Sequence, residues 1–368
     1  MRVVHLVQTL VAGGAETMVR TLCPGLVEAG LDVRVVSVYP SEVDAEQCER
    51  LRAPVLEIGR AGRRDVGFFG RLVRTLRELR PDVVHGHVHT GQYAGRAAAI
   101  IAGVPSIVLT VHGAEPGGPV RWAADRVLHA RTARFVVFSE SQRRAYAAAQ
   151  RVPLDRIVVI PNGVVPPVLA RGRGELRAEL GIPSGAFVFY SAARLAAVKN
   201  QRAAIDALAL ARAGGGADLR LVFAGTGPLA DELRAHAAAS GLGEAVRFLG
   251  HRADAPELLP AMDAFIYPSL SERMPMALGE AMLSGVAPVI TPWDGYADVV
   301  SDGATALVAA GFDAPSIAAA MQRAAGDPAA LTAIGAAARR HAFASFDVAT
   351  MVRRHVEVYR ALAAERAA

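Results

Sequence analysis

Strand-like and helix-like segments alternate along almost the whole chain. Short apolar or β-branched runs such as Val3–Val7 and Ser106–Val111 are separated by stretches with helical character, such as Ala15–Ala29, Gln92–Ala102 and Val120–Ala130. Because a repeated strand–helix–strand pattern builds parallel sheets with helices on both faces, we predict an α/β protein of the doubly wound, Rossmann-like type. Further strands are expected at Asp32–Tyr39, Asp82–Val84, Arg134–Phe138, Ile157–Ile160, Phe187–Ala192, Leu219–Ala224, Val246–Leu249, Ala264–Tyr267, Ala287–Thr291 and Thr305–Val308.

Two domains are expected from the length of 368 residues and from a pause in this alternation. The pause is the segment Ile160–Pro167, where prolines and an Asn-Gly pair interrupt regular structure. A second strand–helix series follows, and the tail from Asp313 is helical and rich in alanine. Open α/β sheets bind ligands at the carboxyl ends of their strands, so two such sheets facing each other predict a site in a cleft between them.

The composition excludes several other classes of protein. Apolar residues make up 52% of the chain and charged residues 20%, which excludes a largely disordered chain. No apolar run approaches the ~20 residues of a membrane span, and the N-terminus lacks the apolar region of a signal peptide. Cys23 and Cys48 cannot form a disulfide framework, so we expect a cytoplasmic location. Aromatic residues make up only 6% of the chain, which argues against a nucleic-acid partner.

Two glycine-bearing loops could approach an anion. Gly13 and Gly14 follow the first strand and precede a helix, where backbone N–H groups and the helix dipole favour negative charge. A tight turn explains this pair equally well, and the full G-x-G-x-x-G spacing of a dinucleotide site is absent. Gly225-Thr226-Gly227-Pro228 follows a later strand, and simple turn chemistry is again an equal alternative.

Charged residues stand out in two other loops. Arg194 and Lys199 follow a strand and precede a helix, where two cations could neutralise a diphosphate, although a solvated basic loop is the alternative. Lys199 is the one lysine among 40 basic residues. Glu272 and Glu280 lie eight residues apart, and a helix beginning near Pro275 would place Glu272 in the preceding loop. This spacing suits recognition of ligand hydroxyls better than a hydrolytic acid–base pair, while Glu280 alone could be a helix-surface residue.

In combination, these motifs resemble glycosyltransferase family 4, the retaining transferases of the GT-B fold that use nucleotide sugars. The resemblance runs in order along nearly the whole chain. Its motifs are Gly-Gly-Ala-Glu at 13–16, His112 in Thr-Val-His-Gly, Pro-Asn-Gly-Val at 161–164, Arg194 with Lys199, Gly-Thr-Gly-Pro at 225–228, and Glu272 and Glu280 with Gly285 downstream.

The resemblance implies a division of labour between the domains. Residues 165–347 would bind the nucleotide sugar, with a UDP or GDP sugar the expected donor. Residues 1–164 would bind the acceptor, a glycan or a lipid-linked sugar. The last helix of this family crosses back onto the N-terminal domain, so residues 348–368 are assigned to it. No cofactor is implied.

The resemblance also implies roles for single residues. Arg194 and Lys199 would contact the diphosphate, Glu280 the ribose, and Glu272 the hydroxyls of the transferred sugar. The other implied contacts are those of Gly14 with the phosphates from the opposite domain, of His112 with the sugar ring, and of Gly225 and Gly227 with the nucleotide.

The sequence departs from the family pattern at four places. Arg273 follows Glu272 at a position where a glycine is usual, and Gly279 precedes Glu280 where an apolar residue is common. Further along, Trp293-Asp294-Gly295-Tyr296 replaces a glycine pair, and Asp298 stands for a glutamate. Arg273 and Trp293 bear on the sugar pocket, so the identity of the sugar stays open.

No metal site is expected, although one histidine run raises the question. His85, His87 and His89 alternate at strand spacing and would point to one face, where zinc could bind. We favour a strand-end loop without metal, because neither a cysteine nor a carboxylate joins the three histidines. No Asp-x-Asp motif is evident on a loop.

A basic stretch bears on the acceptor. Residues 60–80 contain seven arginines, and Phe68–Arg80 has an apolar stripe at helical spacing. Such a helix can lie on an anionic membrane surface, in keeping with an enzyme that is peripheral at the inner face of the cell membrane. An ordinary surface helix with its apolar side in the core is the favoured alternative. Two other functions stay open, a nucleotide-sugar 2-epimerase of the same fold and a non-catalytic subunit that binds a nucleotide sugar.

Overall fold

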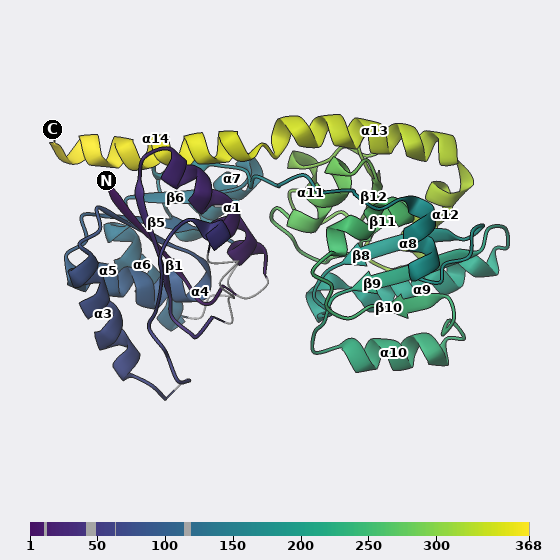
Figure 1. Ribbon diagram of the computed structural model, residues 1–368, viewed down its shortest axis with the longest axis horizontal. Helices are drawn as coiled ribbons and strands as arrows, with labels where there is room; N and C mark the ends of the chain where they lie inside the picture. Colours follow the sequence, from purple (N-terminus) through teal and green to yellow (C-terminus); the bar gives the residue numbers. More distant parts are fainter. Residues whose placement is uncertain (11–12, 42–48, 63, 114–118, 368) are drawn as a thin grey trace. The chain divides into compact units, whose positions relative to one another are not determined.

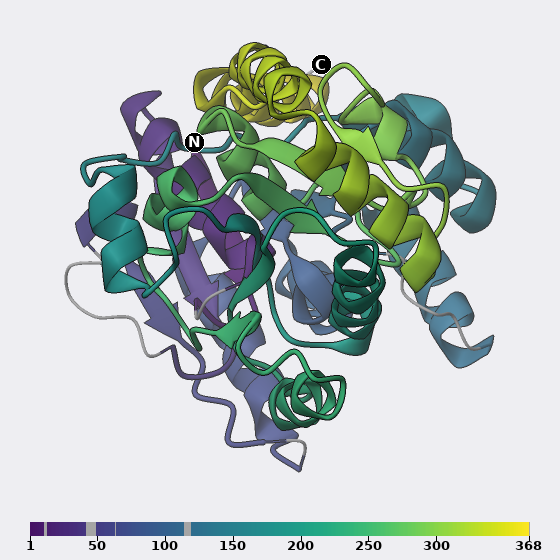
Figure 2. The same ribbon diagram turned by 90° about the vertical axis from the view of Figure 1, so that its right-hand side faces the viewer.

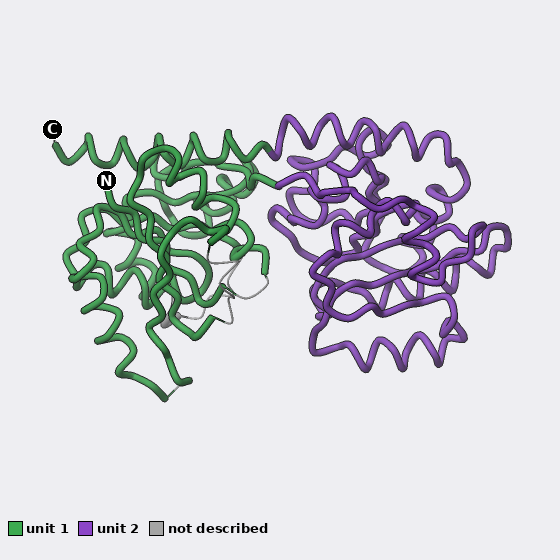
Figure 3. The backbone as a smooth tube through the Cα atoms, viewed as in Figure 1, with its two compact units in different colours: residues 1–164, 347–368 green, residues 165–346 purple. Residues whose placement is uncertain are grey.

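The computed structural model describes residues 1–10, 13–41, 49–62, 64–113 and 119–367. The chain forms two compact units, one of Met1–Val164 with Asp347–Ala368 and one of Val165–Phe346 (Figure 3). We call them unit 1 and unit 2. No helix within the described ranges is long and apolar enough to cross a membrane.

Unit 1 contains a parallel sheet of seven strands in the order β3-β2-β1-β4-β5-β6-β7. The order reverses between β1 and β4, which is the topological switch point of a doubly wound sheet. The strands are β1 (Arg2–Val7), β2 (Asp32–Ser37), β3 (Val55–Glu57), β4 (Val83–Gly86), β5 (Ser106–Thr110), β6 (Arg134–Val137) and β7 (Ile157–Val159).

Helices cover both faces of this sheet (Figure 1). Alternate side chains of β1 enter two different cores: Val3 and Val7 pack with α1 and α14, while Val4 and Leu6 pack with α3 and α5. The helices of unit 1 are α1 (Gly14–Glu28), α3 (Gly67–Leu79), α4 (Val88–Thr90), the π-helix η1 (Gly91–Gly95), α5 (Arg96–Ala102), α6 (Pro119–Arg131), α7 (Glu140–Gln150), η2 (Leu154–Arg156) and α14 (Val348–Ala367).

The final helix, α14, packs onto unit 1 through a tight backbone contact. A Cβ atom on Gly163 would lie 2.6 Å from the Cα atom of Val348, and the Gly163 N–H donates to the Met351 sulfur at 3.1 Å. The Pro-Asn-Gly-Val motif at 161–164 therefore has a structural reason for its glycine. The first residue of α14 packs so closely on Gly163 that a side chain there would clash with it.

Unit 2 contains a parallel sheet of six strands in the order β10-β9-β8-β11-β12-β13. Its order reverses between β8 and β11, so it repeats the topology of unit 1. The strands are β8 (Phe187–Ala192), β9 (Leu219–Ala224), β10 (Val246–Phe248), β11 (Ala264–Tyr267), β12 (Ala287–Ile290) and β13 (Leu307–Val308).

Helices flank the unit 2 sheet as well, and Figure 2 turns this unit toward the viewer. Helices α9 and α12 pack on each other and share a core with β8 and β9, in which Phe189, Leu208, Leu221 and Met321 are buried. The helices of unit 2 are α8 (Arg173–Glu179), η3 (Ala197–Lys199), α9 (Gln201–Ala213), α10 (Ala230–Ala239), η4 (Ala255–Ala261), α11 (Met276–Leu283), η5 (Tyr296–Asp298), α12 (Ala314–Gly326) and α13 (Pro328–Ser345).

The predicted fold class of two doubly wound parallel sheets is confirmed. The short strand β3 was not predicted, and the helix expected over Gln92–Ala102 opens with a π-helical turn. The expectation that His85, His87 and His89 share one strand face is wrong. Strand β4 ends at Gly86, Val88 adopts a φ of 48°, and His89 lies exposed on α4.

Candidate functional site

The charged loops of unit 2 lie at one edge of its sheet. The segments carrying Arg194 and Lys199, Gly225 and Gly227, and Glu272 follow β8, β9 and β11, all at the carboxyl ends of parallel strands. Strands β8 and β11 flank the switch point, where open α/β sheets bind ligands. The sequence therefore places these residues at the edge where the topology makes a site.

Lys199 and Glu272 form the centre of this edge. The Lys199 Nζ atom lies 2.5 Å from Oε1 of Glu272 and donates to the Tyr267 hydroxyl at 2.7 Å. The lysine side chain is 20% exposed and the glutamate side chain 11% exposed. Tyr267 is buried, and burial, followed by the charge of Glu272, raises the pKa of its phenol well above the usual 10. The phenol therefore stays neutral and contacts Lys199 as a hydrogen-bond acceptor.

Backbone contacts hold Lys199 in place. The turn η3 ends at Lys199, and Asn200 follows it with a left-handed φ of 54°. The Leu270 N–H donates to the Val198 carbonyl at 2.8 Å, which ties the loop after β11 to the loop after β8. Lys199 and Glu272 thus come from loops that are bonded to each other.

Gly225 and Gly227 permit a second close approach between loops. A Cβ atom on Gly225 would lie 2.1 Å from the Ala193 carbonyl oxygen, and one on Gly227 would lie 2.2 Å from the Leu195 carbonyl oxygen. The Leu195 N–H also donates to the Thr226 carbonyl at 2.9 Å. These glycines therefore fix the backbone on either side of Arg194.

Arg194 and Arg273 provide further positive charge at this edge. The Arg194 side chain is exposed, and its carbonyl accepts from the Gln201 side-chain amide at 2.9 Å. Neither guanidinium group forms an ion pair or hydrogen bond with any residue that the structure describes. Both cations are therefore available to an anionic ligand.

Glu280 lies on α11, which begins after Pro275 as predicted. Burial raises the pKa of its carboxyl group from 4.5 to about 7. The carboxylate makes no hydrogen bond or ion pair within the described part of the chain, and its charge also raises the pKa of Tyr267. Glu280 is therefore a partly buried acceptor without a partner, not a helix-surface residue.

Trp293, which replaces a glycine of the family pattern, packs against the candidate site, a position that the sequence did not predict. Its side chain is buried and meets Tyr267 edge to face, with ring centroids 6.0 Å apart. Trp293 therefore supports the tyrosine that contacts Lys199.

Gly14 in unit 1 is the first residue of α1, and no atom of the described residues lies within 4 Å of the position its Cβ would take. Among these residues, nothing blocks the approach of an anion to this helix start.

His112 follows β5 and belongs to a cluster of histidines. Its Nε2 atom lies 3.2 Å from Nδ1 of His87, and burial lowers the pKa of His112 to about 4. The cluster also includes His5, His85 and His355, which sequence analysis missed or did not connect, because they come from β1, β4 and α14.

Three of these histidines could be considered as metal ligands. One ring nitrogen from each of His5, His85 and His87 lies within 4.8 Å of the others. Most of the ring nitrogens are already hydrogen-bonded: His5 Nδ1 bonds to His87 at 3.0 Å, and His85 bonds to Tyr359 and Thr110 at 2.6 and 2.7 Å. The three rings therefore belong to a buried network of hydrogen bonds, and this network contains no anionic side chain.

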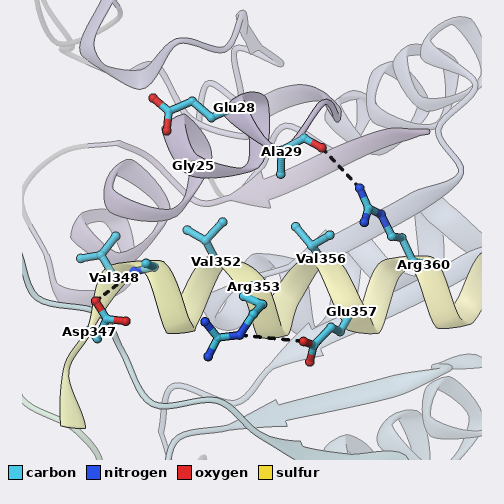
Figure 4. A pocket seen from close by; sticks show the side chains of 11 residues that line it. Gly25, Glu28, Ala29, Asp347, Val348, Val352, Arg353, Val356, Glu357 and Arg360 are labelled. Atoms are coloured by element: carbon cyan, nitrogen blue, oxygen red, sulfur yellow. Dashed lines mark hydrogen bonds and ion pairs between the residues drawn. The ribbon is translucent and has the colours of Figure 1, made fainter. Parts of the chain in front are cut away.

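A separate groove lies between α1 and α14 of unit 1 (Figure 4). It has a volume of about 760 Å³. Val348, Val352 and Val356 point from α14 toward α1, and Arg353 and Glu357 of the same helix also line the groove. None of the predicted site residues lines it.

Comparison with known proteins agrees with the motif resemblance in both units. Residues 172–341 match the family described as Glycosyl transferases group 1, and residues 12–166 match the family described as Glycosyltransferase Family 4. The glycogen synthase of Mycobacterium tuberculosis is 30% identical over 387 aligned positions, which cover 98% of this chain and 90% of that protein.

Two further similarities concern a transferase and a solved structure. The UDP-Gal:alpha-D-GlcNAc-diphosphoundecaprenol alpha-1,3-galactosyltransferase of Escherichia coli is 30% identical over 236 residues, 61% of each chain. The structure of HepE from Anabaena, determined in complex with UDP and glucose, has a TM-score of 0.85 at 22% identity and covers 98% of this chain and all of that one. The chain therefore belongs to the group 1 glycosyltransferases of glycosyltransferase family 4 and has the GT-B fold.

Proposed function

We propose that this enzyme transfers a sugar, with retention of anomeric configuration, from a nucleoside diphosphate sugar to a glycan or lipid-linked acceptor. The observation that carries the proposal is the arrangement of Lys199, Glu272 and Tyr267 at the carboxyl edge of the unit 2 sheet. It combines a held cation with a carboxylate that accepts hydroxyl hydrogen bonds, which is the pairing that a sugar diphosphate needs.

The cations serve the leaving group. When the bond between the anomeric carbon and the phosphate oxygen breaks, the diphosphate gains negative charge. Lys199 and Arg194 stabilise that charge, and preorganised cations do so without rearrangement during the reaction. Because Lys199 already meets Glu272 and Tyr267, its position is set before the donor binds.

The carboxylates and unit 1 residues serve recognition. We assign Glu272 to hydroxyls of the transferred sugar and Glu280, which lacks a partner, to the ribose. Gly225 and Gly227 hold the loop of Arg194 and thereby shape the nucleotide site. From the family resemblance, Gly14 is assigned to the phosphates and His112 to the sugar ring.

The side chains that we assign to the diphosphate are cations, so the proposed reaction does not use a metal ion. Retention is tested by the product: an α-linked donor must give an α-linked product, and a β-linked product would contradict it. Nuclear magnetic resonance of the anomeric proton distinguishes the two.

The relatives guide the choice of donor and acceptor. The relative from Escherichia coli is named for UDP-galactose and an undecaprenol diphosphate acceptor, and the Anabaena structure contains UDP. We therefore propose a UDP sugar ahead of a GDP sugar. Measuring hydrolysis of UDP, GDP and ADP sugars without acceptor tests this order, and selective hydrolysis of a GDP or an ADP sugar would contradict it.

A lipid-linked acceptor would bring unit 1 to a membrane, so we propose that the enzyme is peripheral at the cytoplasmic membrane face. Helix α3 buries Phe68, Leu72 and Leu76 in the core of unit 1, as an ordinary surface helix does. Its opposite side exposes Arg74, and Arg77 and Arg80 lie exposed near its end. These cations support binding to anionic lipid by charge, without insertion of the apolar face.

A further inference from the structure

Five of the ten histidines gather in unit 1, on the face of the sheet that α14 covers. They come from four segments and are His5, His85, His87, His112 and His355. The rings of His85 and His87 lie 4.3 Å apart between centroids, and four of the five residues are completely buried. The exception, His112, is partly exposed.

The cluster is uncharged. Burial lowers the pKa of His5 to about 3 and that of His355 to about 4, and it lowers the pKa of His85 and His87 well below 6.5. A neutral imidazole carries one N–H group and one lone pair, so each ring donates through one nitrogen only.

Three of the rings form a hydrogen-bonded chain. His5 Nδ1 lies 3.0 Å from His87 Nε2, and His87 Nδ1 lies 3.2 Å from His112 Nε2. If His5 donates to His87, then His87 must donate to His112, and all three rings carry the proton on Nδ1. If the direction is reversed, all three carry it on Nε2. The middle ring therefore couples the proton position of His112 to that of His5.

The buried end of the chain decides between the two directions. His5 Nε2 is completely buried and has no partner within the described ranges. The reversed direction would leave an N–H group there without an acceptor, and orphaned buried N–H groups are rare. The forward direction leaves only a lone pair, as also occurs at His355, whose Nδ1 donates to the Met351 carbonyl at 2.8 Å and whose Nε2 has no partner.

We propose that His87 and His5 are positioning residues that hold His112 in the Nδ1–H form, so that His112 presents an N–H donor to a hydroxyl or ring oxygen of the donor sugar. The proposal rests on the proposed contact of His112 with the sugar. It is supported by the outer nitrogen of His112, which has no hydrogen-bond partner in the described structure, whereas its inner nitrogen is engaged by His87.

The proton positions are measured directly by nuclear magnetic resonance of the full-length enzyme labelled with 15N-histidine, without donor. The imidazole 15N shifts should show His112 protonated at Nδ1 in the wild type. His87→Phe should move that proton to Nε2 and lower kcat roughly tenfold, the equivalent of one lost hydrogen bond. Residue 5 does not touch His112, yet His5→Leu should change the 15N shifts of His112 in the same direction. His5→Asn, which restores an N–H donor, should return those shifts to the wild-type values.

His355→Phe is the matched control, because it removes a buried histidine of the same cluster that is outside the chain of three. It should leave the His112 shifts and kcat unchanged, whatever it does to stability. If His87→Phe does not fold, His5→Leu and His5→Asn carry the same test.

A wild-type His112 protonated at Nε2, or an unchanged His112 pattern in both His87→Phe and His5→Leu, would overturn the proposal. Changed 15N shifts of His112 together with a wild-type kcat would uphold the coupling of the rings and overturn the contact of His112 with the sugar. A stoichiometric metal ion bound to His5, His85 and His87 in the purified enzyme would overturn it as well.

Discussion

The Lys199 ammonium and the Glu272 carboxylate form an ion pair of 2.5 Å between the loops after β8 and β11. Each side chain is held by the other before any ligand binds, and the Tyr267 hydroxyl accepts a hydrogen bond from the lysine. The pair places a cation and a hydroxyl acceptor side by side, so under the proposed function we expect recognition of phosphate and of sugar to depend on each other. Removing either member leaves the other with an unpaired charge.

Lys199→Ala should lower turnover by about 10²–10³-fold, because the charge on the leaving diphosphate loses its held cation. The fold should survive, since the lysine is partly exposed and lies outside the core. Steady-state transfer assays and circular dichroism measure the two effects. Tyr267→Phe is the control: it removes only the hydroxyl contact and should lower turnover less than about tenfold. Full turnover in Lys199→Ala would refute its role at the diphosphate.

Glu280 should make stability depend on pH. Its pKa is raised to about 7 in the folded enzyme from 4.5, so the folded state holds the proton more tightly than the unfolded state. The stabilisation is present below pH ~4.5 and is lost as the pH rises to ~7. Glu280→Gln should therefore be more stable than wild type at pH 8, by on the order of 1–3 kcal/mol, in denaturant titration. Equal stability of the two proteins at pH 8 would contradict this account.

Donor affinity should show the opposite pH trend. The ionised Glu280 carboxylate accepts ribose hydroxyl hydrogen bonds better than the protonated form, so KM for the donor should fall as the pH rises through ~7. Glu280→Gln should abolish this dependence and raise KM. A wild-type KM that stays constant between pH 6 and 8 would argue against the ribose contact.

Gly225→Ala should destabilise unit 2 and weaken donor binding. The added Cβ would meet the Ala193 carbonyl at 2.1 Å in a backbone with φ of 143°, so the loop of Arg194 must shift. We expect a loss of about 1–3 kcal/mol of stability and a raised KM. Gly243→Ala is the control, because no atom of the described chain lies within 4 Å of its Cβ position. Wild-type stability and KM in Gly225→Ala would show that the two loops do not need this contact.

The arginines of α3 should bind anionic lipid. Arg74/Arg80→Glu should reduce co-sedimentation with anionic vesicles, and the loss should shrink at high salt because exposed charges are screened. Arg71 is left unchanged, since it pairs with Asp65 at 2.6 Å. Arg339/Arg340→Glu on α13 is a control of equal charge change. Equal binding by both double variants and wild type would remove the membrane surface from the proposed function.

The sheets could be predicted because their strands are short apolar runs between helical segments. Strand β3 (Val55–Glu57) was not predicted, because it is three residues long and lies at the sheet edge after Pro54. The histidine run was misread as a strand because alternation alone does not reveal the close contact of Gly86 with Gly91, where an added Cβ would come within 2.8 Å. That contact turns the chain before His89.

The residues of the candidate site were named from the sequence, but their contacts with one another were not predicted. Lys199 and Glu272 were each assigned to the donor, yet their mutual ion pair joins positions 73 residues apart and has no local signal. His5 and His355 were missed for the same reason, because α14 reaches the sheet from the far end of the chain. The unusual pKa of Glu280 also depends on burial, which no spacing of glutamates reveals.

A crystal structure of the enzyme with UDP or GDP tests the central claim most directly. The account predicts that the nucleotide lies at the carboxyl edge of the unit 2 sheet, with a phosphate oxygen within hydrogen-bond distance of Lys199 Nζ or the Arg194 guanidinium. A nucleotide bound elsewhere, with no phosphate contact to either cation, would contradict it.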